Sequence, residues 1–319
     1  MKEILIEVKN LKKHFRLSNQ EIVHAVDGLS FAIRKGEIIG LVGESGCGKT
    51  TTGRLILRLI EPDEGEVLFE KENISNFSFR EMVSLRRKMQ IIFQDPFSSL
   101  DPRKNVENLI AQPLKIHNFG NEKKIKERTI FLMDKVGLTR EMSTKYAHEL
   151  DGGRCQRIGI ARALALDPVF IVCDEPVSAL DVSIQAQILN LLEGLSKELE
   201  LTYLFISHDL SVVRRLSHRI MVMYLGLIVE LASSKELFDN PLHPYSKALL
   251  SAVPSLKISK QRKRIILKGD VPTPINVGSG CRFFPRCDLA LSICSHVDPS
   301  LKEVEPNHYV ACHLYTEDK

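Results

Sequence analysis

The stretch Ile39-Gly40-Leu41-Val42-Gly43-Glu44-Ser45-Gly46-Cys47-Gly48-Lys49-Thr50-Thr51 indicates the fold of this chain. It carries the pattern G-x-x-x-x-G-K-[ST] between an apolar run, typical of a buried strand, and a helix-like run over residues 50–59. Its glycines permit a tight loop with positive φ, so successive N–H groups can point at one anion. The following helix adds free N–H groups and the positive end of its dipole. The stretch therefore predicts a phosphate-binding loop.

Two side chains of this loop carry specific roles. Lys49 can reach the β- and γ-phosphates as a point charge, and the hydroxyl of Thr50 can ligate Mg²⁺. We expect nucleotide contacts along the whole loop, from Gly43, Glu44, Ser45, Gly46, Cys47, Gly48, Lys49, Thr50 and Thr51.

Length and composition limit the possible classes of protein. The chain has 319 residues, of which 44% are hydrophobic and 26% charged, as in a soluble globular protein. Its net charge of +4 is too small for this length to indicate nucleic-acid binding. No apolar run approaches the roughly 18 residues of a membrane span, and the N-terminus lacks the apolar region of a signal peptide. We expect a cytoplasmic location.

Polar residues follow two further apolar strands. Gln94 follows a short buried strand over residues 89–93, and its carbonyl oxygen can ligate Mg²⁺ or orient water. Asp174 and Glu175 follow an apolar strand over residues 169–173. This pair fits a Walker B element, in which the first carboxylate ligates Mg²⁺ and the second orients or deprotonates an attacking water.

Two rings are candidates for nucleotide contact. His208 follows an apolar strand over residues 203–206 and can touch a γ-phosphate. Phe15 lies between two predicted strands, over residues 4–8 and 23–33, which flank a polar turn. It can stack on a purine, although packing in the core is an equally good interpretation. Residues 106–146 have a charged, helical pattern that indicates an inserted helical lobe.

Taken together, the set resembles the ATP-binding cassette (ABC) ATPases, with their motifs in the family's order. These are Walker A at 43–50, a Q-loop at Gln94, a signature at 150–154, Walker B at 170–174, a D-loop at 178–181 and a switch histidine at His208. The stretches at 93–103, 174–181 and 240–250, and the tail from Gly280, are similar to the ATP-binding subunits of oligopeptide and dipeptide permeases, most of all to the F-type subunit.

The resemblance implies a P-loop α/β fold with an inserted helical subdomain (about 97–160), an antiparallel β-subdomain and a Cys-rich C-terminal extension. We expect a nucleotide-binding domain at 1–253 and the extension at 254–319. The implied function is an ATPase that powers peptide import. It would be a peripheral protein at the cytoplasmic face of the cell membrane, bound to a sister ATP-binding subunit, two transmembrane permease subunits and an extracytoplasmic peptide-binding protein.

In this family two cassettes close head to tail, so each ATP lies between the Walker motifs of one chain and the signature of the other. The resemblance then implies that Lys49 holds phosphates, Glu175 positions water and His208 contacts the γ-phosphate. Mg²⁺ would be bound by Thr50, Gln94 and Asp174. Contacts to the partner's nucleotide are expected from Asp151, Gly152, Gly153 and Asp181.

The signature departs from the family's usual Leu-Ser-Gly-Gly-Gln-Arg-Gln-Arg, because Asp151, Arg154 and Cys155 replace serine, glutamine and arginine. An ionised Asp151 can only accept hydrogen bonds, whereas serine donates one to the γ-phosphate. Aspartate and serine stabilise a helix to nearly the same extent as N-cap residues, so capping does not distinguish them. We therefore predict an asymmetric heterodimer, in which the site containing Lys49 and Glu175 hydrolyses ATP and the site facing Asp151 turns over weakly.

Four of the seven cysteines gather at the C-terminal end as C-x5-C-x6-C-x17-C: Cys281, Cys287, Cys294 and Cys312. The spacing differs from that of a zinc finger, while four thiolates can hold a [4Fe–4S] cluster at varied spacings. The family resemblance also points to such a cluster. Zinc and reduced structural thiols remain alternatives.

Other function classes fit less well. A soluble ABC ATPase acting on DNA would carry a long coiled coil between the Walker motifs, and residues 49–174 show no sustained heptads. Translation-type members usually join two cassettes, and this chain has one. A non-hydrolysing regulatory cassette is suggested by Asp151 but opposed by Glu175 and His208. An exporter is disfavoured by the tail and by the lack of a fused membrane domain.

Overall fold

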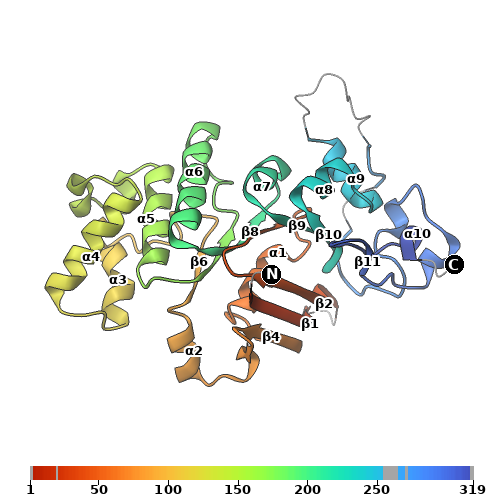
Figure 1. The fold of residues 1–319 in the computed structure, drawn as a ribbon, viewed down its shortest axis with the longest axis horizontal. Helices are drawn as coiled ribbons and strands as arrows, with labels where there is room; N and C mark the ends of the chain where they lie inside the picture. The colour runs from red at the N-terminus through yellow and green to blue at the C-terminus, as the bar shows by residue number, and fades with distance from the viewer. Residues whose placement is uncertain (1–2, 19–20, 254–264, 270–271, 317–319) are drawn as a thin grey trace.

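A mixed eight-stranded sheet forms the centre of the fold (Figure 1). The computed structural model describes residues 3–18, 21–253, 265–269 and 272–316. The strands lie in the order β11-β12-β10-β9-β3-β8-β7-β6. Their bounds are β3 Ile38–Val42, β6 Met89–Ile92, β7 Phe170–Asp174, β8 Thr202–Ser207, β9 Arg219–Tyr224, β10 Leu227–Ser233, β11 Lys302–Glu305 and β12 His308–Val310. The five strands from β9 to β6 are parallel, and β10, β12 and β11 continue the sheet in antiparallel pairs.

The parallel part of the sheet explains where the predicted motifs meet. Strands β3, β7 and β8 are buried along their whole length, as expected for apolar strands covered on both faces. Parallel strands end at one edge, so the loop after Val42, the acids at 174 and 175, and His208 come together there.

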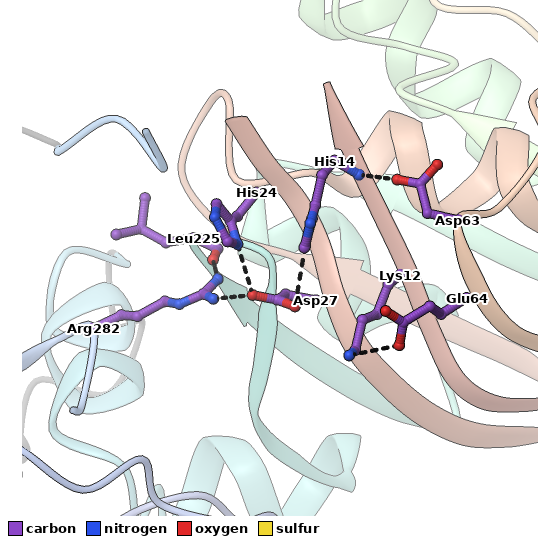
Figure 2. Close-up of polar contacts among 8 residues, drawn as sticks. All are labelled: Lys12, His14, His24, Asp27, Asp63, Glu64, Leu225 and Arg282. Atoms are coloured by element: carbon purple, nitrogen blue, oxygen red, sulfur yellow. Dashed lines mark hydrogen bonds and ion pairs between the residues drawn. The ribbon is translucent and has the colours of Figure 1, made fainter. Parts of the chain in front are cut away.

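A second, antiparallel sheet has the order β2-β1-β4-β5, with β1 Ile4–Arg16, β2 Ile22–Arg34, β4 Glu64–Phe69 and β5 Glu72–Asn73. The predicted strand over residues 4–8 is too short, because β1 continues through the polar stretch read as a turn. Cross-strand ion pairs hold this stretch in the sheet: Lys12 Nζ lies 2.7 Å from Glu64 Oε2, and Lys13 Nζ lies 2.7 Å from Asp63 Oδ1. Figure 2 shows the first of these pairs.

The helices cover the central sheet and extend it at one end. They are α1 Lys49–Ile56, α2 Phe79–Leu85, α3 Val106–Ile116, α4 Glu122–Lys135, α5 Gly152–Leu164, α6 Val182–Leu199, α7 Leu210–Leu216, α8 Ser234–Asp239, α9 Pro244–Ser251 and α10 His313–Thr316. In Figure 1, α3, α4 and α5 lie together at the end of the molecule opposite the C-terminal strands. Helix α1 ends at Ile56, before the predicted end at residue 59. Arg58, just beyond the helix, has a left-handed φ of 48°, which does not continue an α-helix.

The C-terminal strands belong to the central sheet. Strand β12 pairs with β10 at Glu230↔Val310 and Leu231↔Tyr309. The predicted division at 253/254 falls at the start of residues 254–264, which lie outside the described part of the chain. The described part of the tail nevertheless continues the central sheet, because its strand β12 pairs with β10. Within the described residues, no helix combines the length and the apolar character needed to span a membrane.

Candidate nucleotide-binding site

The phosphate loop between β3 and α1 holds Lys49 in a defined position. The side chain is only 5% exposed, and its Nζ donates to the carbonyl oxygens of Gly43 at 2.9 Å and Glu44 at 3.0 Å. The loop packs closely on its surroundings: a Cβ added at Gly48, where φ is 105°, would lie 2.0 Å from the carbonyl oxygen of Ala25. Only glycine fits there. Two carbonyl oxygens of the loop thus hold the ammonium group of Lys49 in place.

A cavity of about 660 Å³ opens beside this loop. Its lining combines the phosphate loop with the ends of β1, β2, β6, β7 and β8. The lining residues are Phe15, Val23, Ala25, Ser45, Gly46, Gly48, Lys49, Thr50, Thr51, Gln94, Glu175 and His208. The volume and the combination of an apolar wall with a cationic wall suit a nucleotide, whose base presents an aromatic face and whose phosphates are charged.

Thr50 and Asp174 form the candidate magnesium position. Thr50, which lines the cavity, donates from Oγ1 to Asp174 Oδ1 at 2.8 Å. Asp174 is buried, which raises the pKa of its carboxyl group above the usual value, while the hydrogen bond from Thr50 acts in the opposite direction. A hydroxyl and a carboxylate oxygen this close together are the hard ligands that Mg²⁺ prefers. The residues present therefore fit the ion.

Two other predicted site residues, Gln94 and His208, meet at Glu175. Its Oε2 accepts a hydrogen bond from Gln94 Nε2 at 3.3 Å and lies 3.1 Å from His208 Nδ1. The backbone of Glu175 has a positive φ of 45°, and its N–H donates to the carbonyl oxygen of Ile206 at 3.0 Å. Such a conformation is costly for a non-glycine residue and is often found at functional sites. It turns this carboxylate into the cavity.

Two loop residues predicted to contact the nucleotide, Glu44 and Cys47, have side chains that do not line the cavity. The carboxylate of Glu44 pairs with Arg286 in the C-terminal tail, at 2.8 Å from Oε2 to Nη1. Cys47 is buried, and burial raises the pKa of its thiol. Neither side chain lines the cavity, so their contribution to nucleotide binding is limited to the backbone and to the shape of the loop.

The predicted signature residues lie apart from this cavity, at the start of α5. Asp151 caps that helix by accepting from the N–H of Arg154 at 2.8 Å, and Arg154 Nη1 lies 3.3 Å from Asp151 Oδ2. Gly152 and Gly153 form the first turn of α5, and Asp181 caps α6 in the same way, with the N–H of Ile184 at 3.0 Å. These four residues line no part of the chain's own nucleotide cavity.

Comparison with known proteins identifies the family. The family described as ABC transporter matches residues 26–178, and the family described as oligopeptide/dipeptide transporter, C-terminal region, matches residues 229–294. The oligopeptide transport ATP-binding protein AppF of Bacillus subtilis (strain 168) is 50% identical over 323 aligned positions, which cover 98% of each chain. The chain belongs to the ABC transporter ATPases. ATP and Mg²⁺ are accordingly the substrate and ion expected at the site.

Other ABC transporter proteins agree with this assignment. The oligopeptide transport ATP-binding protein OppF of the same organism is 50% identical and covers 98% of this chain and 97% of its own length. Among solved structures, the dimeric bacterial ABC transporter cassette MJ0796 has a TM-score of 0.67 and 28% identity, over 72% of this chain and 99% of that one.

Sequence reasoning missed four residues of this ABC transporter site. Val23 and Ala25 line the cavity from β2, a position that depends on how the strand faces the loop and has no motif of its own. Tyr245 and Arg286 hold Glu44 from the C-terminal side, through its N–H and its carboxylate. Tyr245 and Arg286 lie in the stretches 240–250 and 280–287, which resemble the ATP-binding subunits of peptide permeases. This resemblance was the signal in the sequence that could have indicated them.

Proposed function

We propose that this chain is the ATP-hydrolysing subunit of a transporter that imports peptides. The proposal is supported by the relatives named for oligopeptide transport, which match over nearly the whole chain, and by the second family match at 229–294. The observation that carries the hydrolytic part is the convergence of Gln94 and His208 on the Glu175 carboxylate beside the phosphate loop.

The residues of the site divide the work of phosphoryl transfer. Lys49 and the loop amides bind the β- and γ-phosphates. The Glu175 carboxylate positions a water and takes up its proton as the water oxygen bonds to the γ-phosphorus, while the bond to the β–γ bridging oxygen breaks and ADP leaves. His208, which holds that carboxylate, is placed to contact the γ-phosphate. Mg²⁺ held by Thr50 and Asp174, with Gln94 as a further ligand, would neutralise charge on the phosphate oxygens. Positioning and charge neutralisation supply most of the acceleration in such reactions.

The assembly we propose contains a sister ATP-binding subunit, two transmembrane permease subunits and an extracytoplasmic peptide-binding protein. The chain would be a peripheral protein on the cytoplasmic face of the membrane, with its cassette at 1–253, a helical subdomain at about 97–160 and an extension at 254–319. A head-to-tail dimer is supported by the separation of Asp151, Gly152, Gly153 and Asp181 from the chain's own cavity, since these residues are then available to a partner's nucleotide.

Within that dimer we propose unequal sites. Asp151 is exposed and bears the carboxylate that would face the partner's γ-phosphate, while Arg154 is already paired with it. A unit charge pair at about 4 Å in an effective dielectric near 20 is worth roughly 4 kcal/mol, here repulsive. Solvent screening and the neighbouring guanidinium reduce this value. The site formed by this chain's own Lys49 and Glu175 would carry most of the hydrolysis.

For the tail we propose an iron–sulfur cluster held by Cys281, Cys287, Cys294 and Cys312, with zinc as the alternative. Burial raises the pKa of the Cys281 thiol to about 11, and the three other thiols add to this effect, as expected for sulfurs gathered together. In the described part of the chain, no three of these sulfurs lie within 4.8 Å of one another. Tetrahedral zinc, with Zn–S of about 2.3 Å, would hold them about 3.8 Å apart. Four thiolates can hold a [4Fe–4S] cluster at varied spacings, and the iron–sulfur cluster therefore stays the first proposal for this tail.

The experiment that tests the transport function is peptide uptake by the reconstituted complex. The chain is assembled with its sister subunit and the membrane pair in vesicles, with the binding protein and labelled peptide on one side and Mg-ATP on the other. Lys49→Ala should abolish uptake because the phosphates lose their cationic partner. Normal uptake by this variant would refute the proposal.

A further inference from the structure

A tail arginine reaches the phosphate loop. Arg286 closes the short 3-10 helix Phe284–Arg286, directly before Cys287. Its guanidinium binds the carboxylate of Glu44 through two contacts, Nη1 to Oε2 at 2.8 Å and Nη2 to Oε1 at 3.2 Å. The Arg286 side chain is only 7% exposed and its guanidinium lies over the ring of Tyr224, 6.0 Å from the centroid. This is a directional, largely buried ion pair, which resists solvent screening.

Glu44 connects that ion pair to the nucleotide site through its backbone. Its N–H donates to the hydroxyl of Tyr245 at 3.0 Å, and its carbonyl oxygen accepts from Lys49 Nζ at 3.0 Å. Tyr245 is fully buried in α9. One residue of the loop is therefore fixed at its side chain by the tail and at its amide by α9, while its carbonyl holds the lysine that binds phosphate.

The tail loop itself is anchored a second time. Arg282, four residues before Arg286, pairs with Asp27 of β2 and donates to the carbonyl oxygen of Leu225 (Figure 2). Asp27 also meets His14 Nε2 at 3.2 Å and His24 Nδ1 at 3.0 Å. Because the loop is held on the antiparallel sheet by Arg282, Arg286 has a fixed base from which to hold Glu44.

We propose that Arg286 is a positioning residue for the phosphate loop: by holding Glu44 it sets the conformation in which Lys49 receives the β- and γ-phosphates. The C-terminal tail thereby controls the affinity for Mg-ATP. The inference rests on the nucleotide-binding role of the cavity and is independent of which substrate the transporter carries.

The test compares Arg286→Gln with a matched variant, Arg219→Gln. Arg219 makes an equivalent paired contact with Glu37, with Nε to Oε1 at 2.6 Å and Nη2 to Oε2 at 2.9 Å. Glu37 stands just before β3 and Glu44 just after it. The two variants thus remove similar ion pairs at opposite ends of one strand, and only one of these pairs touches the phosphate loop.

The affinity of the full-length chain for Mg-ATP is measured by titration with a fluorescent ATP analogue, and the melting temperature is recorded for every variant. Arg286→Gln should lose affinity about tenfold, while Arg219→Gln should lower the melting temperature and leave affinity near that of the wild type. Arg286→Lys keeps the charge without the paired geometry and should recover part of the affinity.

A double-variant cycle gives the second readout. Glu44→Gln should weaken Mg-ATP binding as Arg286→Gln does, and the double variant should be no weaker than either single variant, because both remove one interaction. Equal affinities for Arg286→Gln and wild type, or losses that multiply in the double variant, would overturn the inference. Failure of the wild-type chain to bind Mg-ATP would instead refute the nucleotide-binding role itself.

Discussion

His208 and Glu175 meet at a single carboxylate oxygen, with His208 Nδ1 lying 3.1 Å from Glu175 Oε2. The two residues follow neighbouring parallel strands, β8 and β7, whose register pairs Asp174 with Ile206. The sheet therefore sets the position of the histidine. His208 in turn holds the Glu175 carboxylate, which lines the cavity.

Glu175→Gln should lower the rate of ATP hydrolysis by about 100-fold or more while Mg-ATP still binds, because the amide keeps the shape of the carboxylate but cannot take up a proton. Steady-state hydrolysis by the assembled complex and nucleotide titration of the single chain measure the two effects. The equivalent change in the sister subunit serves as the control. Similar residual hydrolysis in both complexes would contradict the proposed asymmetry.

Asp151→Ser should raise hydrolysis by the assembled complex, since it replaces a repelling carboxylate with a hydroxyl that can donate to the γ-phosphate. Because serine also caps a helix well, stability should change by less than about 0.5 kcal/mol. Asp151→Asn is the matched control, as it removes the charge but supplies no hydroxyl. If neither variant is faster than the wild type, Asp151 is not the limiting feature of that site.

Cys287→Ser should remove iron and sulfide from protein purified without oxygen, together with its brown colour, because a cluster with four thiolate ligands loses one of them. Iron, zinc and sulfide contents are measured on the same samples as visible absorbance. Cys155→Ser provides the comparison, since Cys155 is buried at the signature helix, far in sequence from the tail. Wild-type protein that carries zinc and no iron would replace the iron–sulfur proposal with its alternative.

The stability of the chain should fall as the pH drops from about 6.5 to about 4, because of His243. Full burial lowers the pKa of this histidine from 6.5 to about 4. Its folded pKa lies below its unfolded value, so the unfolded chain takes up a proton first as the pH falls, and stability is lost from about pH 6.5 down to about pH 4. The gap corresponds to about 3 kcal/mol, at about 1.4 kcal/mol for each pH unit.

Urea unfolding at several pH values, with His243→Asn as the comparison, measures this effect. His243 caps α9 by accepting from the N–H of Tyr245 at 3.0 Å, and asparagine can also cap a helix. The variant should therefore fold and show a weaker dependence on pH over this range. An unchanged dependence would assign the acid sensitivity to other groups.

The sequence predicted the family, which the comparisons confirm, and placed the strand ends that bear Gln94, Glu175 and His208. This was possible because a phosphate-binding loop and polar residues after parallel strands follow local rules of spacing. Phe15, left open between stacking and core packing, lines the cavity.

Contacts between distant segments could not be predicted in this way. The extension of β1 through a polar stretch depends on Asp63 and Glu64, and the anchoring of Glu44 depends on Arg286, which lies 242 residues further along the chain. Periodicity and turn signals describe neighbours in sequence, and an ion pair of this kind leaves no local pattern.

The pairing of β10 with β12 means that the ATPase cannot be shortened at the apparent end of its cassette without exposing an open sheet edge. Glu230, which is completely buried, would lose the contact between its Oε1 and His308 Nε2 at 2.8 Å. The N–H groups of Leu242 and His243 would still donate to this carboxylate. A chain cut at residue 253 would thus combine a buried acid that has lost its histidine partner with an unprotected strand, and an open strand edge promotes aggregation. Expression of this ATPase as a minimal module should accordingly retain the polypeptide through β12.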